Sequence, residues 1–403
     1  MAKLEAFVTP SVMKWAREKA GYDIPTAAEK IRRPESDVEA WENGSDRPSM
    51  AQARRASEVY SRSLAVFYLP EPPKDFATLR DFRHMPSGQP REYSPELALL
   101  VRQVHVRQAW IRESLVGEKM PEVGFVGSVT SDVPPMKVAH SIRQDLSITP
   151  QEQMACPSRH AALRLWIDKA EEAGLFICRQ SGIECQEARG FVLVDAFAPF
   201  IYLNSTDALV AQLFTLVHEL AHVWMGQPGL SNLEGLGRRA RTPDAQVEVF
   251  CNRVAAEALV DQNVFAELWA SADAQLDLQQ RVEWVSGKLK VSEEAVARRL
   301  MDRGQITVER YRELRSFYGE RWRALRRRER ARLRESPGGP SYYVVKVAAI
   351  GRSFTQTVAA AYHRGDISGR DASGLLGVKI NHLTDLAVCA GVRTGMSARG
   401  DER

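Results

Sequence analysis

Two histidines four residues apart are the feature of this 403-residue chain that most clearly offers chemistry. They lie in the mostly apolar segment LFTLVHELAHVW, residues 213–224, whose pattern predicts a buried helix. Residues four apart lie one turn above each other, so His218 and His222 can present both imidazoles to one metal ion. Glu219 then lies beside them, where a bound water would sit. The spacing predicts a catalytic zinc site, and a pair of helix histidines flanking an apolar core is the alternative.

A catalytic zinc ion needs a third protein ligand and one open position. The extended H-E-x-x-H-x-x-G-x-x-H pattern does not supply that ligand, because Met225 and Pro228 stand where the pattern has Gly and His. A carboxylate on the following helix is the alternative, and Thr242 and Pro243 begin that helix as N-cap and first residue.

Glu248 lies at the edge of the apolar stripe of that following helix. A carboxylate there is costly to bury unless it is paired or bound to metal. Asn252, one turn further along, could orient a ligand from behind. A solvated helix-edge acid at Glu248, or Glu234 in the preceding loop as the ligand, remain open alternatives.

The elements that must position these residues indicate an α+β fold that is mainly helical. Two β-like runs, residues 174–178 and 190–203, precede the histidine helix, and the second is broken near Pro199 as a hairpin or a bent strand would be. We expect that helix to start near residues 205–207. Residues 96–116 and most of the chain after residue 265 have helical periodicity, and six prolines between residues 70 and 95 predict an extended connector.

The segment around the histidines resembles the ImmA/IrrE family of metallopeptidases. The shared marks are LFTLVHELAH, ending at His222, and EVFCNRVAA, residues 248–256, while RGFVLV and IYLN resemble the strand pair before that helix. The resemblance implies a zincin-like domain with a small β-sheet, in which His218, His222 and Glu248 hold Zn²⁺. It also implies that Glu219 is the general base and that Cys251 packs in the core rather than binding metal.

The N-terminal segment reads as short helices at residues 15–21, 27–31 and 36–42, the last ended by Asn43 and Gly44. It resembles an XRE-type helix-turn-helix through Ala16, Arg17, Glu18, Gly21, Ala27, Ala28 and DVEAWENG. In that family type the acid at Glu42 pairs with an arginine such as Arg17.

Two departures from the helix-turn-helix pattern bear on DNA binding. Arg32 holds the place in the turn that usually carries glycine, and the recognition helix has Glu35, Asp37 and Glu39 with no basic residue, which repels phosphate. Phosphate contacts would then come from flanking arginines, namely Arg32, Arg33, Arg47, Arg54 and Arg55. Recognition of another protein by this segment is the alternative.

The whole order is similar to the long, fused members of the family. We expect a helix-turn-helix domain at 1–70, a proline-rich connector and helix at 71–135, a metallopeptidase domain at 136–265 and a helical C-terminal domain at 266–403. The last contains a second helix-turn-helix-like unit at 366–383 and an arginine-dense segment at 321–334 with eight arginines in fourteen positions. A solvated helix and a nucleic-acid-binding face are both open for the arginine-dense segment.

Composition narrows the class of protein further. Apolar residues make up 44% and charged residues 26%, which excludes a mainly disordered or fibrous chain. The 55 basic and 51 acidic residues are too evenly matched to imply nucleic acid or a membrane by total charge. Five scattered cysteines without a C-x-x-C pair, no signal peptide and no long apolar stretch predict a cytoplasmic protein with no membrane contact.

Together these patterns predict a zinc-dependent endopeptidase, with the substrate backbone lying as an added strand along the 189–203 hairpin. The family resemblance implies that the substrate is a helix-turn-helix repressor, whose cleavage switches on stress, mobile-element or toxin–antitoxin genes. The second hypothesis is an XRE-family DNA-binding transcriptional regulator in which the peptidase fold is a sensor or inactive. The oligomeric state stays open.

Overall fold

The structure is a computed structural model that describes residues 5–60, 62–73, 94–227, 229–231, 243–335, 339 and 341–392. The chain divides into two compact units. The first runs to residue 79 and includes residues 84–106, and the second holds residues 107–403 with 80–83. Four predictions fall outside the described residues. They concern Glu234, Thr242, the connector between 74 and 93, and the side chains after residue 324 in the arginine-dense segment.

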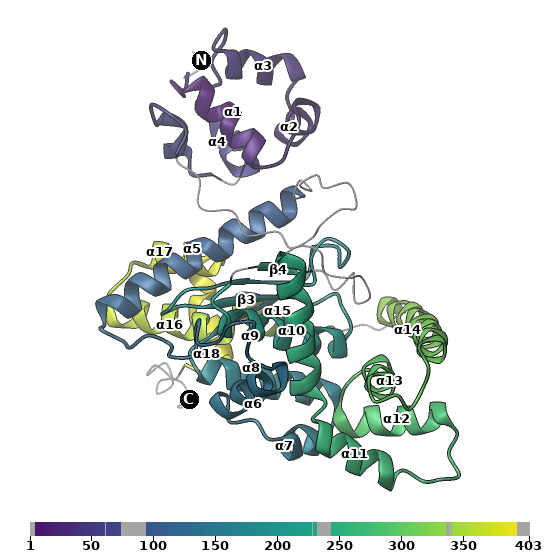
Figure 1. Cartoon of the computed structure of the whole chain (residues 1–403). Helices are drawn as coiled ribbons and strands as arrows, with labels where there is room; N and C mark the ends of the chain where they lie inside the picture. Colours follow the sequence, from purple (N-terminus) through teal and green to yellow (C-terminus); the bar gives the residue numbers. More distant parts are fainter. Residues whose placement is uncertain are drawn as a thin grey trace, which may run out of the picture. The chain divides into compact units, whose positions relative to one another are not determined.

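In its described residues the first unit is built of helices (Figure 1), with one isolated β-bridge between Glu5 and Ser49. Its elements are α1 (Pro10–Lys19), α2 (Ile24–Ile31), α3 (Glu35–Asn43), α4 (Met50–Val59) and the 3-10 helix η1 (Leu64–Tyr68). Their apolar faces enclose a core around the fully buried Trp41. The pattern placed the first helix at 15–21, but α1 begins five residues earlier, because Pro10 supplies a favourable first helical residue.

A buried ion pair joins α1 to α3. The Arg17 guanidinium donates to both carboxylate oxygens of Glu42, from Nε at 2.8 Å and from Nη2 at 2.9 Å, and also to the backbone oxygen of Tyr22 at 2.7 Å. Both charged side chains are over nine-tenths buried. The predicted pairing of Arg17 with Glu42 is therefore confirmed, and its bidentate geometry fixes how the two helices cross.

Arg32 ends α2 in the left-handed conformation, with φ 63° and ψ 51°. The turn thus keeps the geometry that a glycine would adopt, although a side chain there costs about 1–2 kcal/mol. Arg32→Gly removes this strain but also adds conformational entropy to the unfolded chain, which offsets part of the gain. We expect a net stabilisation of the first unit by about 0.5–1 kcal/mol. Hydrogen exchange of the α2 and α3 amides in the full chain measures this change. Arg33→Gly is the matched control and should destabilise the first unit, since Arg33 has no positive φ. Faster amide exchange in Arg32→Gly than in the wild type would contradict backbone strain at Arg32.

The described part of the second unit is mainly helical and contains one small mixed sheet. The helix α5 (Pro95–Gly117) enters it from the first unit at residue 107. The other helices are α6 (Pro135–Asp145), α7 (Pro150–Ala155), α8 (Arg159–Glu172), α9 (Leu209–Trp224), α10 (Pro243–Leu259), α11 (Gln262–Ser271), α12 (Leu278–Leu289), α13 (Glu293–Asp302), α14 (Val308–Glu335), α15 (Tyr342–Ile350), α16 (Arg352–Arg364), α17 (Gly369–Leu376), η2 (Ile380–His382) and α18 (Leu383–Ala390). The predicted mainly helical α+β fold is confirmed. Among the described helices, none combines the length and apolar character needed to cross a membrane.

The sheet contains β1 (Phe176–Gln180), β2 (Gly190–Leu193), β3 (Phe200–Asn204) and β4 (Gly229–Ser231) in the order β1-β3-β2-β4. β1 runs parallel to β3, whereas β2 is antiparallel to both of its neighbours. The predicted break near Pro199 is a hairpin turn between β2 and β3. The amide of Gln108 on α5 donates to the backbone oxygens of Leu193 and Ala198, both at 2.9 Å, and so holds this turn.

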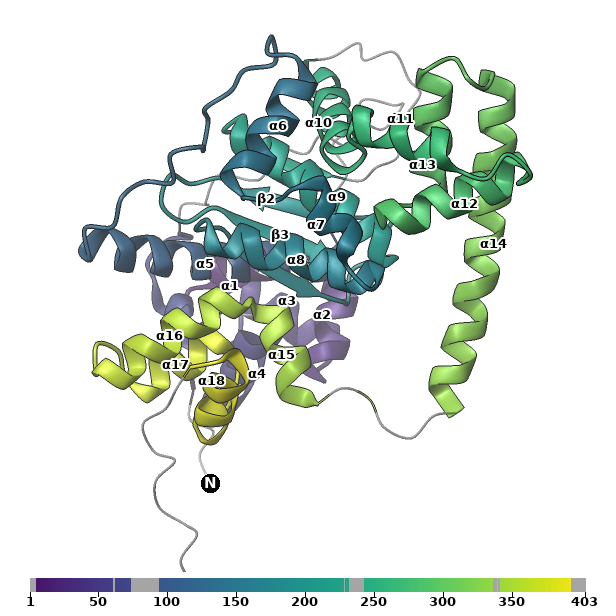
Figure 2. The same ribbon diagram turned by 90° about the horizontal axis from the view of Figure 1, so that it is seen from below.

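Both faces of the sheet are buried, as Figure 2 shows from below. Side chains alternate between the faces, and Val192, Ile201 and Leu203 join the main core with α8 and α9. The opposite face is aromatic: Phe200 stacks on Phe176 at 4.9 Å and meets the edge of Phe354 on α16 at 5.9 Å between ring centroids. The helices after residue 341 therefore complete the packing of the sheet.

The outer edge of β1 is closed by α8 and α16. Gly351 has φ +101°, and a Cβ added there would lie 2.8 Å from the backbone oxygen of Ile177, so only glycine fits. The backbone amide of Ser353 donates to Glu171 at 3.3 Å, and the backbone of Ile177 is a further hydrogen-bond partner of this carboxyl. These contacts leave no place for another strand beside β1.

Burial raises the pKa of Glu171 to about 7, with Asp168 adding to the rise and Arg352 opposing it. The folded chain therefore favours the protonated acid, and the resulting stability is present below the unfolded pKa near 4.3 and lost as pH rises through about 7. We expect Glu171→Gln to stabilise the chain at pH 8 by about 1–3 kcal/mol and to change little at pH 4. Urea unfolding at both pH values tests this, and an equal effect at both would refute it.

Candidate metal centre

Helix α9 carries the two histidines through the main core. It begins at Leu209, slightly after the predicted start, and Asp207 anchors the entry by accepting from the backbone amide of Ala208 at 2.8 Å. The apolar residues around the histidines pack against the sheet, α8 and α10, and so His218, Glu219 and His222 are fully buried. Burial of three polar side chains is costly unless partners surround them.

Helix α10 carries the third group that could bind a metal ion. It packs along α9, as Figure 1 shows, and places Glu248 opposite the two rings. The Nε2 atoms of His218 and His222 lie 3.2 Å apart, and the Glu248 carboxylate oxygens lie 3.4 Å from the former and 3.1 Å from the latter. One ligand atom from each residue lies within 4.8 Å of the other two. The side chain of Glu248 is only 15% exposed, so it is not a solvated helix-edge acid.

Asn252 lies one turn beyond Glu248 and holds the ring of His218. Its Oδ1 lies 3.1 Å from Nδ1 of His218. An amide oxygen only accepts, so the ring proton sits on Nδ1 and the lone pair of Nε2 points toward His222 and Glu248. The ring of His218 is therefore oriented from behind, which is how histidine ligands are usually held.

The charges of the three groups depend on one another. Burial opposes a charge on His218, but the carboxylates of Glu248 and Glu219 raise its pKa above the ordinary value. Burial lowers the pKa of His222, and the neighbouring His218 adds to the fall. Burial alone would raise the pKa of Glu248, yet the two histidines keep it well below its usual range. The centre thus holds an ionised carboxylate against two imidazoles.

These residues fit a divalent zinc ion. Two histidines and one glutamate are a known ligand set of catalytic zinc sites, which keep one position open. Two imidazole nitrogens and an ionised carboxylate converge in the interior, and the negative charge of that carboxylate favours a cation among them. Cys251 does not join the set: its sulfur lies 3.8 Å from the sulfur of Met225 in the core, and burial raises the pKa of its thiol.

Glu219 lies under β2. A Cβ built on Gly190 would be 3.1 Å from Oε1 of Glu219, 2.5 Å from Cγ2 of Thr215 and 2.9 Å from the backbone oxygen of Tyr202. Gly190 therefore lets the strand approach the helix closely enough for the carboxylate to fit. Sequence reasoning missed this role, although a glycine inside a strand is a known sign of such an approach.

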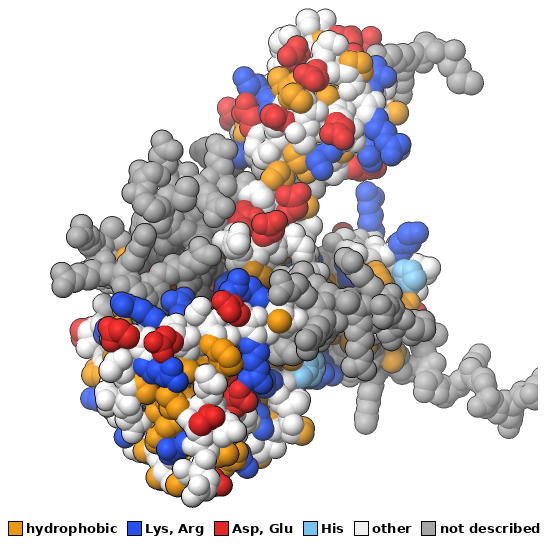
Figure 3. All heavy atoms as spheres, turned by 90° about the vertical axis from the view of Figure 1, so that its right-hand side faces the viewer, with side chains coloured by type: hydrophobic (Ala, Val, Ile, Leu, Met, Phe, Trp, Pro, Cys, Tyr) orange, Lys and Arg blue, Asp and Glu red, His pale blue; other side chains and the backbone are white. Residues whose placement is uncertain are grey.

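The arginines predicted to contact DNA all lie in the first unit, and all five are exposed. Three of them lie within 3.7 Å of a carboxylate, in the pairs Arg33–Asp37, Arg47–Glu5 and Arg55–Glu58. On the face that Figure 3 shows, acidic and basic side chains of this unit are interspersed rather than separated by sign. This view offers no broad basic surface for a phosphate backbone.

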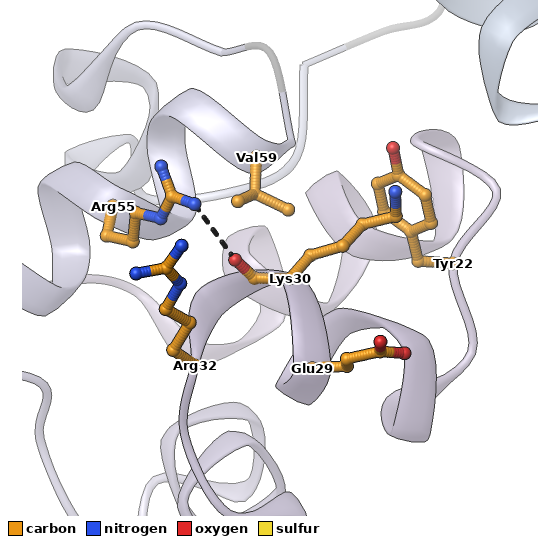
Figure 4. Close-up of a pocket in the computed structure, with 6 residues that line it drawn as sticks. All are labelled: Tyr22, Glu29, Lys30, Arg32, Arg55 and Val59. Atoms are coloured by element: carbon orange, nitrogen blue, oxygen red, sulfur yellow. Dashed lines mark hydrogen bonds between the residues drawn. The ribbon is translucent and has the colours of Figure 1, made fainter.

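Three basic side chains of the first unit line a shallow depression of about 430 Å³. It is lined by Tyr22, Glu29, Lys30, Arg32, Arg55 and Val59. Figure 4 shows the guanidinium groups of Arg32 and Arg55 on the same side of it, with Arg55 donating to the backbone oxygen of Lys30 at 3.2 Å. Arg54 is exposed on the same helix as Arg55 and does not line the depression.

Comparison with known families agrees with the geometry of the centre. Residues 170–301 match Peptidase_M78, the IrrE N-terminal-like domain. The match contains the sheet, the histidine helix and the helix of Glu248, and it runs past residue 265 as far as α13. It supports a metallopeptidase-type function for this part of the chain. A search of curated proteins found no match to the chain.

Proposed function

We propose that this chain is a zinc-dependent endopeptidase. The observation that carries the proposal is the convergence of His218, His222 and Glu248 from two helices, with Glu219 buried beside them. A bound zinc ion supplies Lewis-acid polarisation of a peptide carbonyl and lowers the pKa of water toward neutrality.

The chain's own residues supply the rest of the chemistry. Glu219 takes the proton of the attacking water and returns it to the leaving amine, as a general base and then a general acid. Asn252 keeps the ring of His218 in the tautomer that leaves its Nε2 unprotonated. The buried setting strengthens each of these interactions, since little water competes for the groups.

We further propose a protein substrate, a helix-turn-helix repressor whose removal switches on stress, mobile-element or toxin–antitoxin genes. The family resemblance supports this choice, and the first helical unit, with its acidic helix α3, would recognise a basic surface on such a protein.

The second candidate is an XRE-family regulator that binds DNA and uses the peptidase fold as a sensor. The observation in its favour is the depression lined by Lys30, Arg32 and Arg55, which suits a phosphate group. Footprinting at the chain's own promoter tests this candidate. Protection that survives Glu219→Gln but is lost in an Arg54→Ala, Arg55→Ala double variant would support it.

Zinc content tests the first proposal. We expect the purified full chain to hold about one zinc ion, and His222→Ala to lose it, because a catalytic site needs its three protein ligands. His140→Ala is the control, since this histidine is exposed and distant in sequence from the centre. Elemental analysis measures the zinc content, and incubation with a helix-turn-helix repressor that is encoded next to this chain measures cleavage. Equal zinc content in the wild type and in His222→Ala would refute the assignment of His222 as a zinc ligand.

A further inference from the structure

The two edges of the sheet are both occupied in the described part of the chain. Glu171 and Gly351 close the outer edge of β1, and β4 pairs with the outer edge of β2. A substrate strand is predicted to bind along the β2–β3 hairpin, but the edge of β2 that faces away from β3 is already paired with β4. The partner of β2 is a segment of the chain itself, only three residues long.

The direction of each backbone group on β2 follows from its pairing with β3. The backbone amide of Asn204 donates to the oxygen of Arg189 at 2.9 Å, so alternate residues from Arg189 onward point their amides and carbonyls at β3. Gly190 and Val192 point theirs the other way, toward β4, where Ser231 and Gly229 are their partners. By the same alternation, the amide and carbonyl of Leu230 point away from β2.

The position of Glu219 decides which edge a substrate must use. Its carboxylate lies against Gly190, the residue that pairs with Ser231. A peptide in the place of β4 would run directly beside Gly190. A peptide added outside β4 would lie a further strand spacing away, roughly 4.8 Å, with β4 between it and β2.

We propose that β4 occupies the edge of β2 to which an extended protein substrate binds, so that the chain blocks its own peptide-binding edge. The identity of the bound strand as a substrate rests on the proposed endopeptidase function. The claim that β4 covers a peptide-binding edge concerns β2 and β4 alone. The substrate strand replaces Gly229–Ser231 and takes over the amides and carbonyls of Gly190 and Val192. The partner is an extended polypeptide bound by main-chain hydrogen bonds.

Two proline substitutions separate the possibilities. Gly229→Pro removes an amide that faces Val192, whereas Leu230→Pro removes an amide that faces away from β2. In the metal-free full chain, we expect Gly229→Pro to raise hydrogen exchange at the amides of Gly190 and Val192 by at least about tenfold. Leu230→Pro should leave both amides protected as in the wild type.

Peptide binding gives the second measurement. The probe is a fluorescein-labelled synthetic peptide with the sequence of residues 226–234, GQPGLSNLE. We expect metal-free Gly229→Pro to bind this peptide at least tenfold more tightly than the wild type, with Leu230→Pro unchanged. Unchanged exchange and unchanged binding in Gly229→Pro would overturn the inference. If exchange in α9 also rose, the variant would be misfolded, and Ser231→Pro, which removes the amide facing Gly190, would replace it.

Cleavage of casein by the zinc-loaded chain completes the design. Faster cleavage by Gly229→Pro is the expected result. Loss of cleavage in Leu230→Pro, without a gain in Gly229→Pro, would mean that the substrate adds outside β4 and would overturn the inference. If no form of the chain cleaves casein or binds zinc while the exchange and peptide results hold, the peptidase proposal fails and the role of β4 stands.

Discussion

Glu219→Gln is expected to lower the rate of peptide cleavage by about a thousandfold, within the range for loss of a general acid–base group. Glutamine keeps the shape of the side chain but cannot take a proton from water. The zinc content should stay at the wild-type level, because Glu219 is not one of the three ligand groups. Turnover of casein or of the repressor, measured beside elemental analysis, separates the two effects.

The control for this variant is Glu267→Gln, which changes an exposed acid on α11. It should leave both turnover and zinc unchanged. Unimpaired cleavage by Glu219→Gln would remove Glu219 from the mechanism, and loss of zinc would instead make it a ligand.

Gly190→Ala is expected to lower turnover by about a hundredfold or more, since a misplacement of 1 Å at a catalytic group costs that much. The added methyl group would lie 2.5 Å from Cγ2 of Thr215, 2.9 Å from the backbone oxygen of Tyr202 and 3.1 Å from Oε1 of Glu219. The oxygen of Tyr202 belongs to the central strand β3 and cannot yield without disturbing the sheet. The side chains of Thr215 and Glu219 must therefore shift.

A second substitution tests that steric reading. Thr215→Ser keeps the hydroxyl and removes Cγ2, the nearest of the three atoms. We expect Thr215→Ser alone to resemble the wild type, and Gly190→Ala with Thr215→Ser to regain part of the lost turnover. Zinc binding by the metal-free chain gives a readout apart from catalysis, and it should change little in every form. Full turnover in Gly190→Ala would show that β2 and α9 have room to spare.

Local sequence patterns determined much of the centre. The four-residue spacing of His218 and His222 places both rings on one helix face whatever the fold, because helix geometry alone sets that relation. The apolar residues around them required burial. The break near Pro199 allowed a hairpin or a bent strand, and the antiparallel pairing of β2 with β3 decided for the hairpin. The mainly helical fold follows from the same short-range periodicities, which depend on neighbours in sequence.

Other features depended on which elements meet. The place of Glu248 opposite the two histidines depends on how α10 packs along α9, and nothing in the local pattern of this acid sets that approach. The close contact of Gly190 with Glu219 likewise arises between a strand and a helix far apart in sequence. Arg32 is a case in which the local pattern misled. The sequence lacks the expected glycine, yet Arg32 adopts the left-handed conformation that the turn needs.

The sequence by itself determined that this chain carries a helix with two potential metal ligands and a potential base, and which strands precede it. Only the tertiary structure decided that α16 covers the aromatic face of the sheet and that Gly229–Ser231 pairs with β2. The apolar stripe of α16 requires a buried face but does not name its partner. A three-residue strand has no periodicity to read, because its pairing comes from backbone groups that every sequence shares.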